Sequence, residues 1–217
     1  MRPALLLSQQ IDQLASLYLS SQPTNEPLSK ADRQAVSTWL LFDTEFAKSV
    51  EGDSQLRFER AVALRRVGFA NMLLGDIDAA IEALNPALDV LDQLREEEPT
   101  NISLSVEGAG GYSQLAQLYH RQGNREQATL SCDRAFALLQ SELHGMSQEW
   151  DDEVKRPLAQ LARLYSSLGS SIDAAKVASA NREVLERLLQ ERGDSPEDMA
   201  LLKASLQIIN AANADQS

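Results

Sequence analysis

The side chains best suited to binding chemistry in this sequence are four arginines and one histidine. They lie in three segments that share one pattern of apolar residues: Arg65, Arg66, His120, Arg156 and Arg163. Guanidinium groups bind carboxylates and phosphates through forked hydrogen bonds. We therefore expect a surface for an acidic or phosphorylated partner. The alternative is that these arginines pair with acids on neighbouring helices or only solvate a helix face.

The sequence offers little for catalysis or metal binding. It has one cysteine and two histidines, and no nucleophile motif or zinc-ligand spacing surrounds them. The acidic run that follows His144 matches no calcium loop, so we expect a solvated helix start there. Cys132 falls on an apolar helix face and is expected to be a small core residue. We predict a protein that is not an enzyme and that needs no cofactor or metal.

Length and charge narrow the class of protein further. The chain has 217 residues, of which 43% are hydrophobic, and 32 acidic against 20 basic residues give a net charge of -12. Partners rich in phosphate select Lys and Arg, so this balance argues against nucleic acid and against an anionic membrane. No apolar run is long enough for a signal peptide or a membrane span. We expect a cytoplasmic protein.

A repeated pattern indicates how the elements are arranged. Residues 67–75, 115–123 and 161–169 align without gaps, each with a large apolar residue, then Gly or Ala, and a final Gly. The glycines Gly75, Gly123 and Gly169 are 48 and 46 residues apart. Leu and Ala outnumber Val and Ile, which favours helix. Self-similarity at such a period is typical of a solenoid of helical hairpins.

These residues resemble the tetratricopeptide repeat (TPR), in which a large residue, a small one, an aromatic, Gly and Ala recur at the same offsets. The resemblance covers residues 54–191 and implies a right-handed α-α superhelix. Because the period exceeds the usual 34 or so residues, both helices of each pair must be long. Residues 57–68 and 83–88 also resemble the repeat region that follows the kinase domain in planctomycete-type bacterial serine/threonine kinases, although no kinase motif is present.

We expect nine helices in one continuous domain. An N-terminal pair in residues 1–53 packs on the first repeat, three hairpins occupy residues 54–191, and residues 192–217 form a capping helix with a frayed tail. The helices are expected at about 3–20, 30–50, 55–74, 77–97, 102–122, 124–143, 148–168, 171–191 and 196–212. Capping side chains at Ser29, Ser54, Asp76, Asn101, Ser147 and Ser195 mark several of the starts.

Three local features carry separate expectations. Pro86 and Pro157 fall inside expected helices, so we expect kinks, or a late start for the helix that contains Pro157. The glycine-rich run 107–111 is interpreted as close helix packing or a kink, because no strand or Gly-Lys-Ser/Thr accompanies it. The capping helix should cover the last repeat with residues at helical spacing. These residues are Met199, Leu202, Leu206 and Ile209.

The TPR resemblance also implies which side chains line the concave face, because the first helix of each pair faces inward in that family. The resulting peptide-binding groove would contain Arg65, Arg66, Phe69, Met72, Ser113, Gln114, Gln117, His120, Arg156, Gln160 and Arg163. The Lys and Asn with which the family clamps a C-terminal carboxylate are missing from the matching positions. We therefore do not expect binding of chaperone tails.

The densest aromatic patch lies outside the repeats, between Trp39 and Phe46. It is interpreted as core between the N-terminal helices and the first repeat; the alternative is a homodimer or partner surface. The sequence as a whole predicts a non-catalytic scaffold that binds a peptide or protein, possibly acidic or phosphorylated. Two alternatives remain: a regulatory module that works with a serine/threonine kinase, and a helical protein that binds a small molecule.

Overall fold

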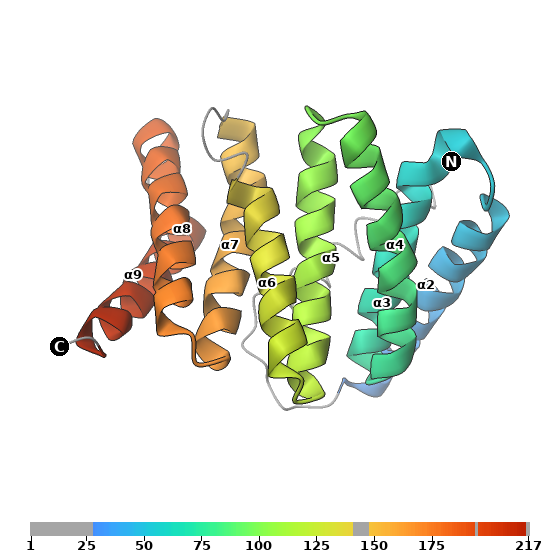
Figure 1. Ribbon diagram of the computed structural model, residues 1–217, viewed down its shortest axis with the longest axis horizontal. Helices are drawn as coiled ribbons and strands as arrows, with labels where there is room; N and C mark the ends of the chain where they lie inside the picture. The colour runs from blue at the N-terminus through green and yellow to red at the C-terminus, as the bar shows by residue number, and fades with distance from the viewer. Residues whose placement is uncertain (1–27, 141–147, 194, 216–217) are drawn as a thin grey trace.

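The computed structural model describes residues 28–140, 148–193 and 195–215, and these ranges contain helices and no strands (Figure 1). A short 3-10 turn, Ser54–Leu56, precedes the first repeat. The α-helices are α2 (Lys30–Ser49), α3 (Arg57–Leu74), α4 (Ile77–Glu97), α5 (Ile102–Arg121), α6 (Arg125–Gln140), α7 (Gln148–Ser167), α8 (Ser171–Arg192) and α9 (Pro196–Ala214).

The expected all-α fold is confirmed, and the helices begin and end within a few residues of the expected positions. The helix expected at 3–20 lies outside the described residues, as does the cap at Ser147. Figure 1 shows the helices side by side in chain order, with α3 and α4, α5 and α6, and α7 and α8 forming three hairpins. The expected division at residues 53 and 191 remains a prediction.

The three aligned glycines end the first helix of each hairpin in the same way. Gly75, Gly123 and Gly169 have φ angles of 90°, 76° and 73°, a left-handed conformation that Gly adopts without steric cost. After Gly75, the Asp76 N–H donates to the Asn71 carbonyl at 2.9 Å, and the other two turns have the equivalent bond. This closure satisfies the last carbonyls of each first helix and starts the second helix at once.

Small residues allow the two helices of a hairpin to approach closely. A methyl group placed on Gly68 would lie 2.6 Å from Leu84 Cγ and 3.2 Å from the Ala80 carbonyl, both in α4. Ala116 and Ala162, at the matching positions of α5 and α7, are completely buried. None of the three small residues therefore faces solvent.

The glycine-rich run in α5 serves packing on three sides. A methyl group on Gly108 would lie 3.0 Å from Leu138 in α6, and one on Gly111 would lie 2.8 Å from Leu88 in α4. Gly110 lies under Arg65 of α3. Close helix packing is thus the correct reading of the run, because side chains from three neighbouring helices fill the space next to α5.

The two prolines lie within continuous helices. Pro86 is inside α4 and Pro157 is inside α7. The helix that contains Pro157 begins at Gln148, so the late start considered for it does not occur. Tertiary packing of the surrounding turns keeps both helices intact despite the lost backbone donor.

Helix α2 closes one end of the described solenoid. Trp39 is 3% exposed and its ring packs against Phe69 of α3, with the ring centroids 5.9 Å apart. Leu41 and Phe42, two and three residues further along α2, are 64% and 46% exposed. The aromatic patch is therefore divided, with Trp39 in the core and its neighbours on the surface.

Helix α9 covers the last repeat with a face different from the expected one. Met199 and Leu206 are exposed, while Asp198, Ser205 and Ala212 are buried. Ser205 accepts a hydrogen bond from the buried Asn181 of α8 at 3.2 Å. The expectation for α9 was therefore wrong for Met199 and Leu206, whereas Ile209 packs against the core and Leu202 is half-buried.

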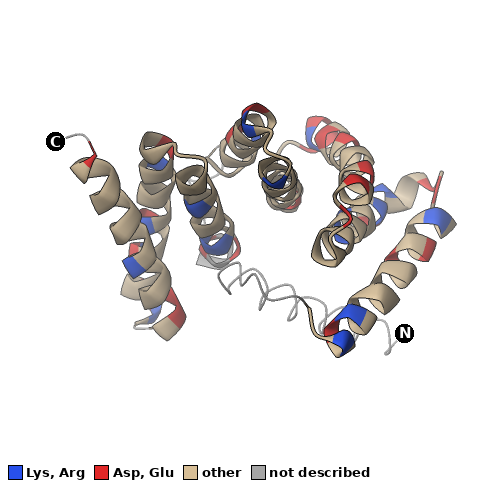
Figure 2. Ribbon diagram, turned by 90° about the horizontal axis from the view of Figure 1, so that it is seen from below, with Lys and Arg blue, Asp and Glu red and all other residues tan. Residues whose placement is uncertain are grey.

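The successive hairpins follow an arc. In Figure 2, which looks along the helices, α3, α5 and α7 lie on the inner side of the arc and α4, α6 and α8 lie on the outer side. Large leucines fill the space between the two rows. Those that are essentially inaccessible are Leu84, Leu91, Leu104, Leu118, Leu139, Leu158, Leu161, Leu185 and Leu188.

Candidate functional site

Arg65, the first of the candidate groove residues, is held by an acid on the next inner helix. Its Nε donates to Glu107 Oε2 at 2.6 Å, and the two side chains are 21% and 24% exposed. Gly110 leaves room for the guanidinium, since a methyl group there would lie 3.6 Å from Arg65 Nη1. Arg65 therefore links α3 to α5, which is the alternative that the sequence left open for these arginines.

Arg156 is likewise paired with an acid that the sequence pattern did not place beside it. Its Nε donates to Glu197 Oε1 of α9 at 2.7 Å, and both side chains are about half exposed. The adjacent Lys155 donates to Asp198 Oδ1 at 2.7 Å, and this pair is nearly buried. The two acids at the start of α9, Glu197 and Asp198, thus form ion pairs with the two neighbouring cations of α7.

Phe69 and Met72 belong to the core. They are 3% and 4% exposed, so they do not form the apolar floor of an open groove. The reason is that α2 packs over this part of α3, where Phe69 meets Trp39. The alignment of the repeats alone does not reveal that Phe69 and Met72 are buried, because it contains no information about the helix that packs on the first repeat.

The middle of α5 presents buried polar groups. Ser113 donates to the carbonyl of Ala109 at 2.8 Å, as serines in helices commonly do. Gln114 is 5% exposed, and its carbonyl oxygen has no hydrogen-bond partner among the residues that the structure describes. It lies on the same helix face as Glu107 and Arg121, which contact α3 through Arg65 and the Met72 carbonyl. A buried acceptor without a donor is costly and rare.

The remaining candidates keep some access to solvent. His120 is exposed, while Arg66, Gln117, Gln160 and Arg163 are half-buried. Arg66 has an interaction partner. For Arg163, no hydrogen bond or ion pair is found with the described part of the chain. The inner helices α5 and α7 therefore offer glutamines and one arginine without an ion pair in the described residues, where the sequence predicted a groove with four arginines and a histidine.

Glu107 and Glu197 are the site residues that the sequence analysis missed. Glu107 lies one turn before Gly110, so it shares its helix face with an inward position of the assumed register. Helical spacing could have identified Glu107. The inward positions were counted only from about Gly110, however, whereas α5 begins one or two turns earlier, at Ile102. Glu197 comes from another element, and no local pattern connects it with Arg156.

Tyrosines pair with acids on the outer side of the arc. Tyr112 donates to Asp92 of α4 at 2.6 Å, and Tyr165 donates to Asp133 of α6 at 2.5 Å. Burial and the neighbouring carboxylate raise the pKa of Tyr112 from 10.0 to about 12, and the same causes raise the pKa of Tyr165 further. Both phenols therefore remain protonated donors at any physiological pH.

Neither a reactive thiol nor a metal-ligand cluster occurs in residues 28–140, 148–193 and 195–215. Cys132 is completely buried, as expected, and burial raises the pKa of its thiol to about 12. No group of three or more His, Cys, Asp or Glu side chains has the geometry to hold a metal ion in these ranges. None of the described helices is both long and apolar enough to span a bilayer.

Comparison with solved structures places this fold among known repeat proteins. The chain resembles the crystal structure of a Podosopora anserina putative kinesin light chain with nearly identical TPR-like repeats, at 18% identity over 96% of this chain and 97% of the other, with a TM-score of 0.49. A variant of that protein gives a TM-score of 0.50 at 17% identity, covering 96% of each chain. No family model matches the chain.

The comparison defines the class of protein as an α-α superhelix of TPR-like repeats. At this level of identity the likeness concerns the fold alone.

Proposed function

We propose that this chain is a non-catalytic scaffold, acting in the cytoplasm, whose inner helices α5 and α7 bind an extended segment of another protein. The observation that carries the proposal is a set of half-buried polar side chains on these two helices, Gln117 on α5 and Gln160 and Arg163 on α7. Gln117 and Gln160 supply amide groups of the kind that bind a peptide backbone.

We further propose that the bound segment is acidic or phosphorylated near Arg163 and His120. Arg163 is half-buried, and a guanidinium in that setting forms stronger charge-assisted hydrogen bonds than one in bulk water. Arg65 and Arg156 are already paired with Glu107 and Glu197, so their contribution to binding an anion is smaller than the sequence predicted. Selectivity would therefore depend on few charges, together with the amides of the inner helices.

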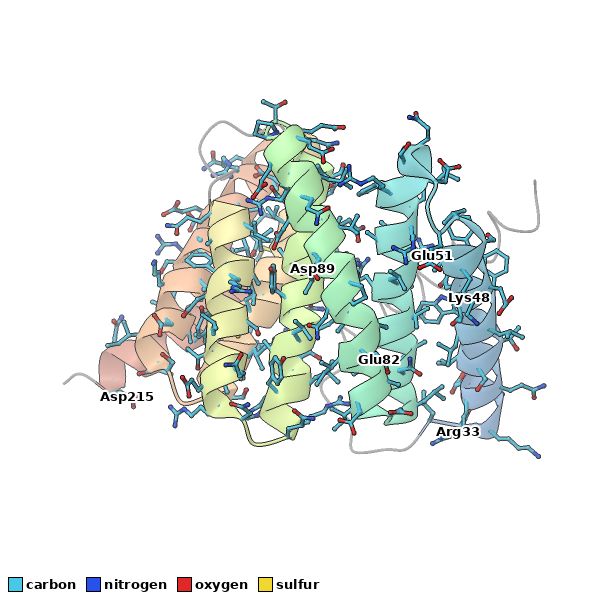
Figure 3. The ribbon with its side chains drawn as sticks, turned by 45° about the vertical axis from the view of Figure 1, so that its right-hand side comes forward. Arg33, Lys48, Glu51, Glu82, Asp89 and Asp215 are labelled. Atoms are coloured by element: carbon cyan, nitrogen blue, oxygen red, sulfur yellow. The ribbon has the colours of Figure 1, made fainter. Side chains whose placement is uncertain are left out.

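An array of acidic and phosphorylated peptides, probed with the full chain, tests this proposal. We expect a subset of the acidic peptides to bind, and we expect Arg163→Glu and Gln117→Leu to weaken that binding by about tenfold or more. Arg33→Glu is the matched control, because it makes the same charge change on exposed α2 (Figure 3). Equal losses from Arg33→Glu and Arg163→Glu would reveal non-specific attraction and overturn the proposal.

Two finer possibilities remain proposals of their own. A role beside a serine/threonine kinase rests on the sequence resemblance of residues 57–68 and 83–88, and a kinase gene adjacent to this one would support it. A homodimer through α2 rests on the exposed Leu41 and Phe42. Sedimentation of the chain and of its Phe42→Asp variant tests the dimer, since a self-association that survives the substitution would exclude this surface.

A further inference from the structure

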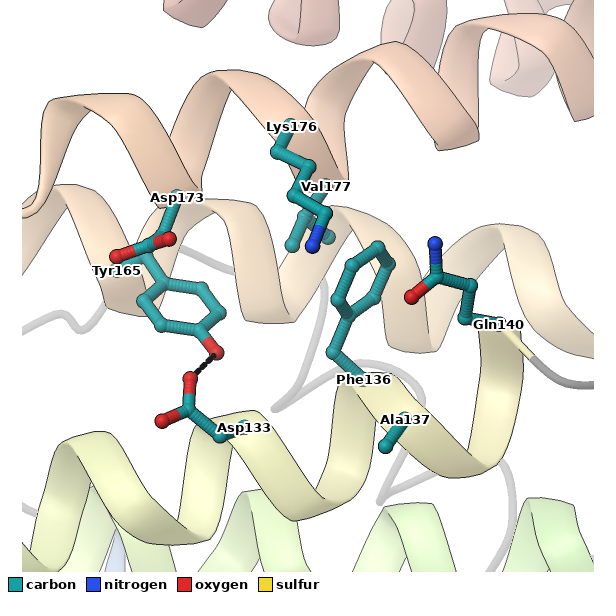
Figure 4. A pocket seen from close by; sticks show the side chains of 8 residues that line it. All are labelled: Asp133, Phe136, Ala137, Gln140, Tyr165, Asp173, Lys176 and Val177. Carbon is teal, nitrogen blue, oxygen red and sulfur yellow. Dashed lines mark hydrogen bonds between the residues drawn. The ribbon is translucent and has the colours of Figure 1, made fainter.

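Two cavities lie in successive grooves between the outer helices. One of about 240 Å³ opens between α6 and α8, with Tyr165 of α7 in its wall (Figure 4). The other, of about 120 Å³, lies between α4 and α6, with Tyr119 of α5 in its wall. Neither cavity belongs to the inner face on which the proposed function rests.

The two cavities are the same site in consecutive repeats. Shifting the α4 residues of the smaller cavity by 48 positions, the distance from Gly75 to Gly123, gives the α6 residues of the larger one. Shifting Tyr119, Gln127, Leu130 and Ser131 by 46 positions, the distance from Gly123 to Gly169, gives the α7 and α8 residues of the larger one. Tyr112, Leu115 and Arg134 of the smaller cavity and Gln140 of the larger one have no counterpart. The matching pairs are Asn85 and Asp133, Leu88 and Phe136, Asp89 and Ala137, Tyr119 and Tyr165, Gln127 and Asp173, Leu130 and Lys176, and Ser131 and Val177.

The chemistry of the larger cavity differs from that of its counterpart. Asp133 and Asp173 replace two neutral amides, so two carboxylates line the cavity (Figure 4). Tyr165 donates to one oxygen of Asp133 at 2.5 Å, and Ser170 donates to one oxygen of Asp173. Each carboxylate keeps a second oxygen for which no donor is found among the residues described. These oxygens can accept hydrogen bonds from a cation that enters the cavity.

The aromatic wall of this cavity already binds a cation. Lys176 Nζ lies 5.2 Å from the centre of the Phe136 ring, within the range of a cation–π contact. No ion pair joins Lys176 to either aspartate in the described residues, so both carboxylates remain available. Val177 and Ala137 add apolar surface against which an aliphatic stem can pack.

The surrounding outer surface has the charge to attract such a partner. Helix α4 carries a row of acids three, four or seven residues apart, which places them on one face of the helix. Its single basic residue is Arg95. The row consists of Asp78, Glu82, Asp89, Asp92 and Glu96, with Glu82 and Asp89 labelled in Figure 3 and acidic residues red in Figure 2. Charges arranged in this way accelerate the approach of a basic partner.

We propose that the outer face binds a basic protein segment, and that the cavity between α6 and α8 takes an Arg or Lys side chain of that segment. The segment crosses α6 toward α4, where the cavity between α4 and α6 accommodates a second, polar side chain, since Asn85, Asp89, Gln127 and Arg134 line it beside Leu88 and Leu130. This surface goes beyond the proposed function, because it lies on the opposite row of helices and selects the opposite charge.

Binding of a fluorescent oligoarginine peptide to the full chain tests this assignment, with an oligoglutamate peptide of equal length as the comparison. We expect the oligoarginine to bind and the double variant Asp133→Asn/Asp173→Asn to weaken its binding roughly tenfold or more. Asp215→Asn is the control for each of the single variants Asp133→Asn and Asp173→Asn, since it also removes one charge, at the exposed end of α9, and should leave the affinity unchanged (Figure 3).

Lys176→Gln distinguishes a site for a cation from a site for an anion. The proposal requires tighter oligoarginine binding in this variant, because a competing cation leaves the cavity. Tighter binding of oligoglutamate by Asp133→Asn/Asp173→Asn, with loss of that binding in Lys176→Gln, would overturn it. Equal losses from Asp215→Asn and the double variant would also overturn it, by showing that only net charge matters. None of these results depends on Gln117 or Arg163, so the inner face is tested separately.

Discussion

Lys155 Nζ of α7 lies 2.7 Å from Asp198 Oδ1 of α9, and the two side chains are only 10% and 6% exposed. This pair joins the C-terminal helix to the last hairpin at a point where water is nearly excluded. Beside it, Arg156 and Glu197 make a similar bond at the surface. The contact between α7 and α9 therefore contains one buried and one exposed ion pair side by side, so the contributions of the two can be compared in one protein.

Asp198→Asn should lower the free energy of unfolding by about 3 kcal/mol, because it leaves the buried ammonium without its carboxylate. Glu197→Gln should lower it by no more than about 1 kcal/mol, since water replaces the lost partner. Urea denaturation of the three proteins measures both changes. Similar losses in the two variants would show that α9 is not held by the buried pair.

Two glycine substitutions should act in opposite directions. Gly68→Ala should destabilise the protein by about 1–3 kcal/mol, because the added methyl group would lie 2.6 Å from Leu84 Cγ. Gly110→Ala should stabilise it by up to about 1 kcal/mol, since the methyl group meets Arg65 at an ordinary 3.6 Å and Ala favours helix. Thermal unfolding of both variants checks the signs. A stabilising Gly68→Ala would contradict the packing of α3 on α4.

Ionisation of Tyr112 should lower the stability of the folded protein in strong alkali. Its pKa is raised to about 12 in the folded state, from 10.0, so the unfolded chain loses this proton first as the pH rises. The stabilisation is thus fully present below pH 10 and is lost between about pH 10 and 12. Urea unfolding at several pH values in this window should show a smaller decline for Tyr112→Phe than for the parent protein. Identical slopes would mean that this phenol is not protected by burial and Asp92.

Cys132 should be inert in the folded protein. Burial raises the pKa of its thiol to about 12, and the reactive thiolate is therefore scarce at neutral pH. A colorimetric disulfide reagent should modify it only as fast as the chain opens, and rapidly once guanidinium chloride unfolds the protein. Fast modification of the native chain, compared with a Cys132→Ala blank, would place the thiol at an accessible surface.

The sequence by itself determined the repeated hairpins. A large residue, a small one and a terminal Gly set the end of each first helix and the approach of the second, and these are interactions between residues close in the chain. The left-handed Gly75 and the contact of Gly68 with Leu84 are therefore where the pattern placed them.

Only the tertiary structure decided which charges are neutralised and which faces are covered. Arg65 meets Glu107 across two helices, Arg156 meets Glu197 from a different element, and α2 covers Phe69. The docked face of α9 combines the polar contacts of Asn181 and Lys155 with the apolar Ile208 and Ile209, so apolar periodicity alone did not define it. Such pairings depend on distances between segments far apart in the chain, which a periodic pattern along one helix does not contain.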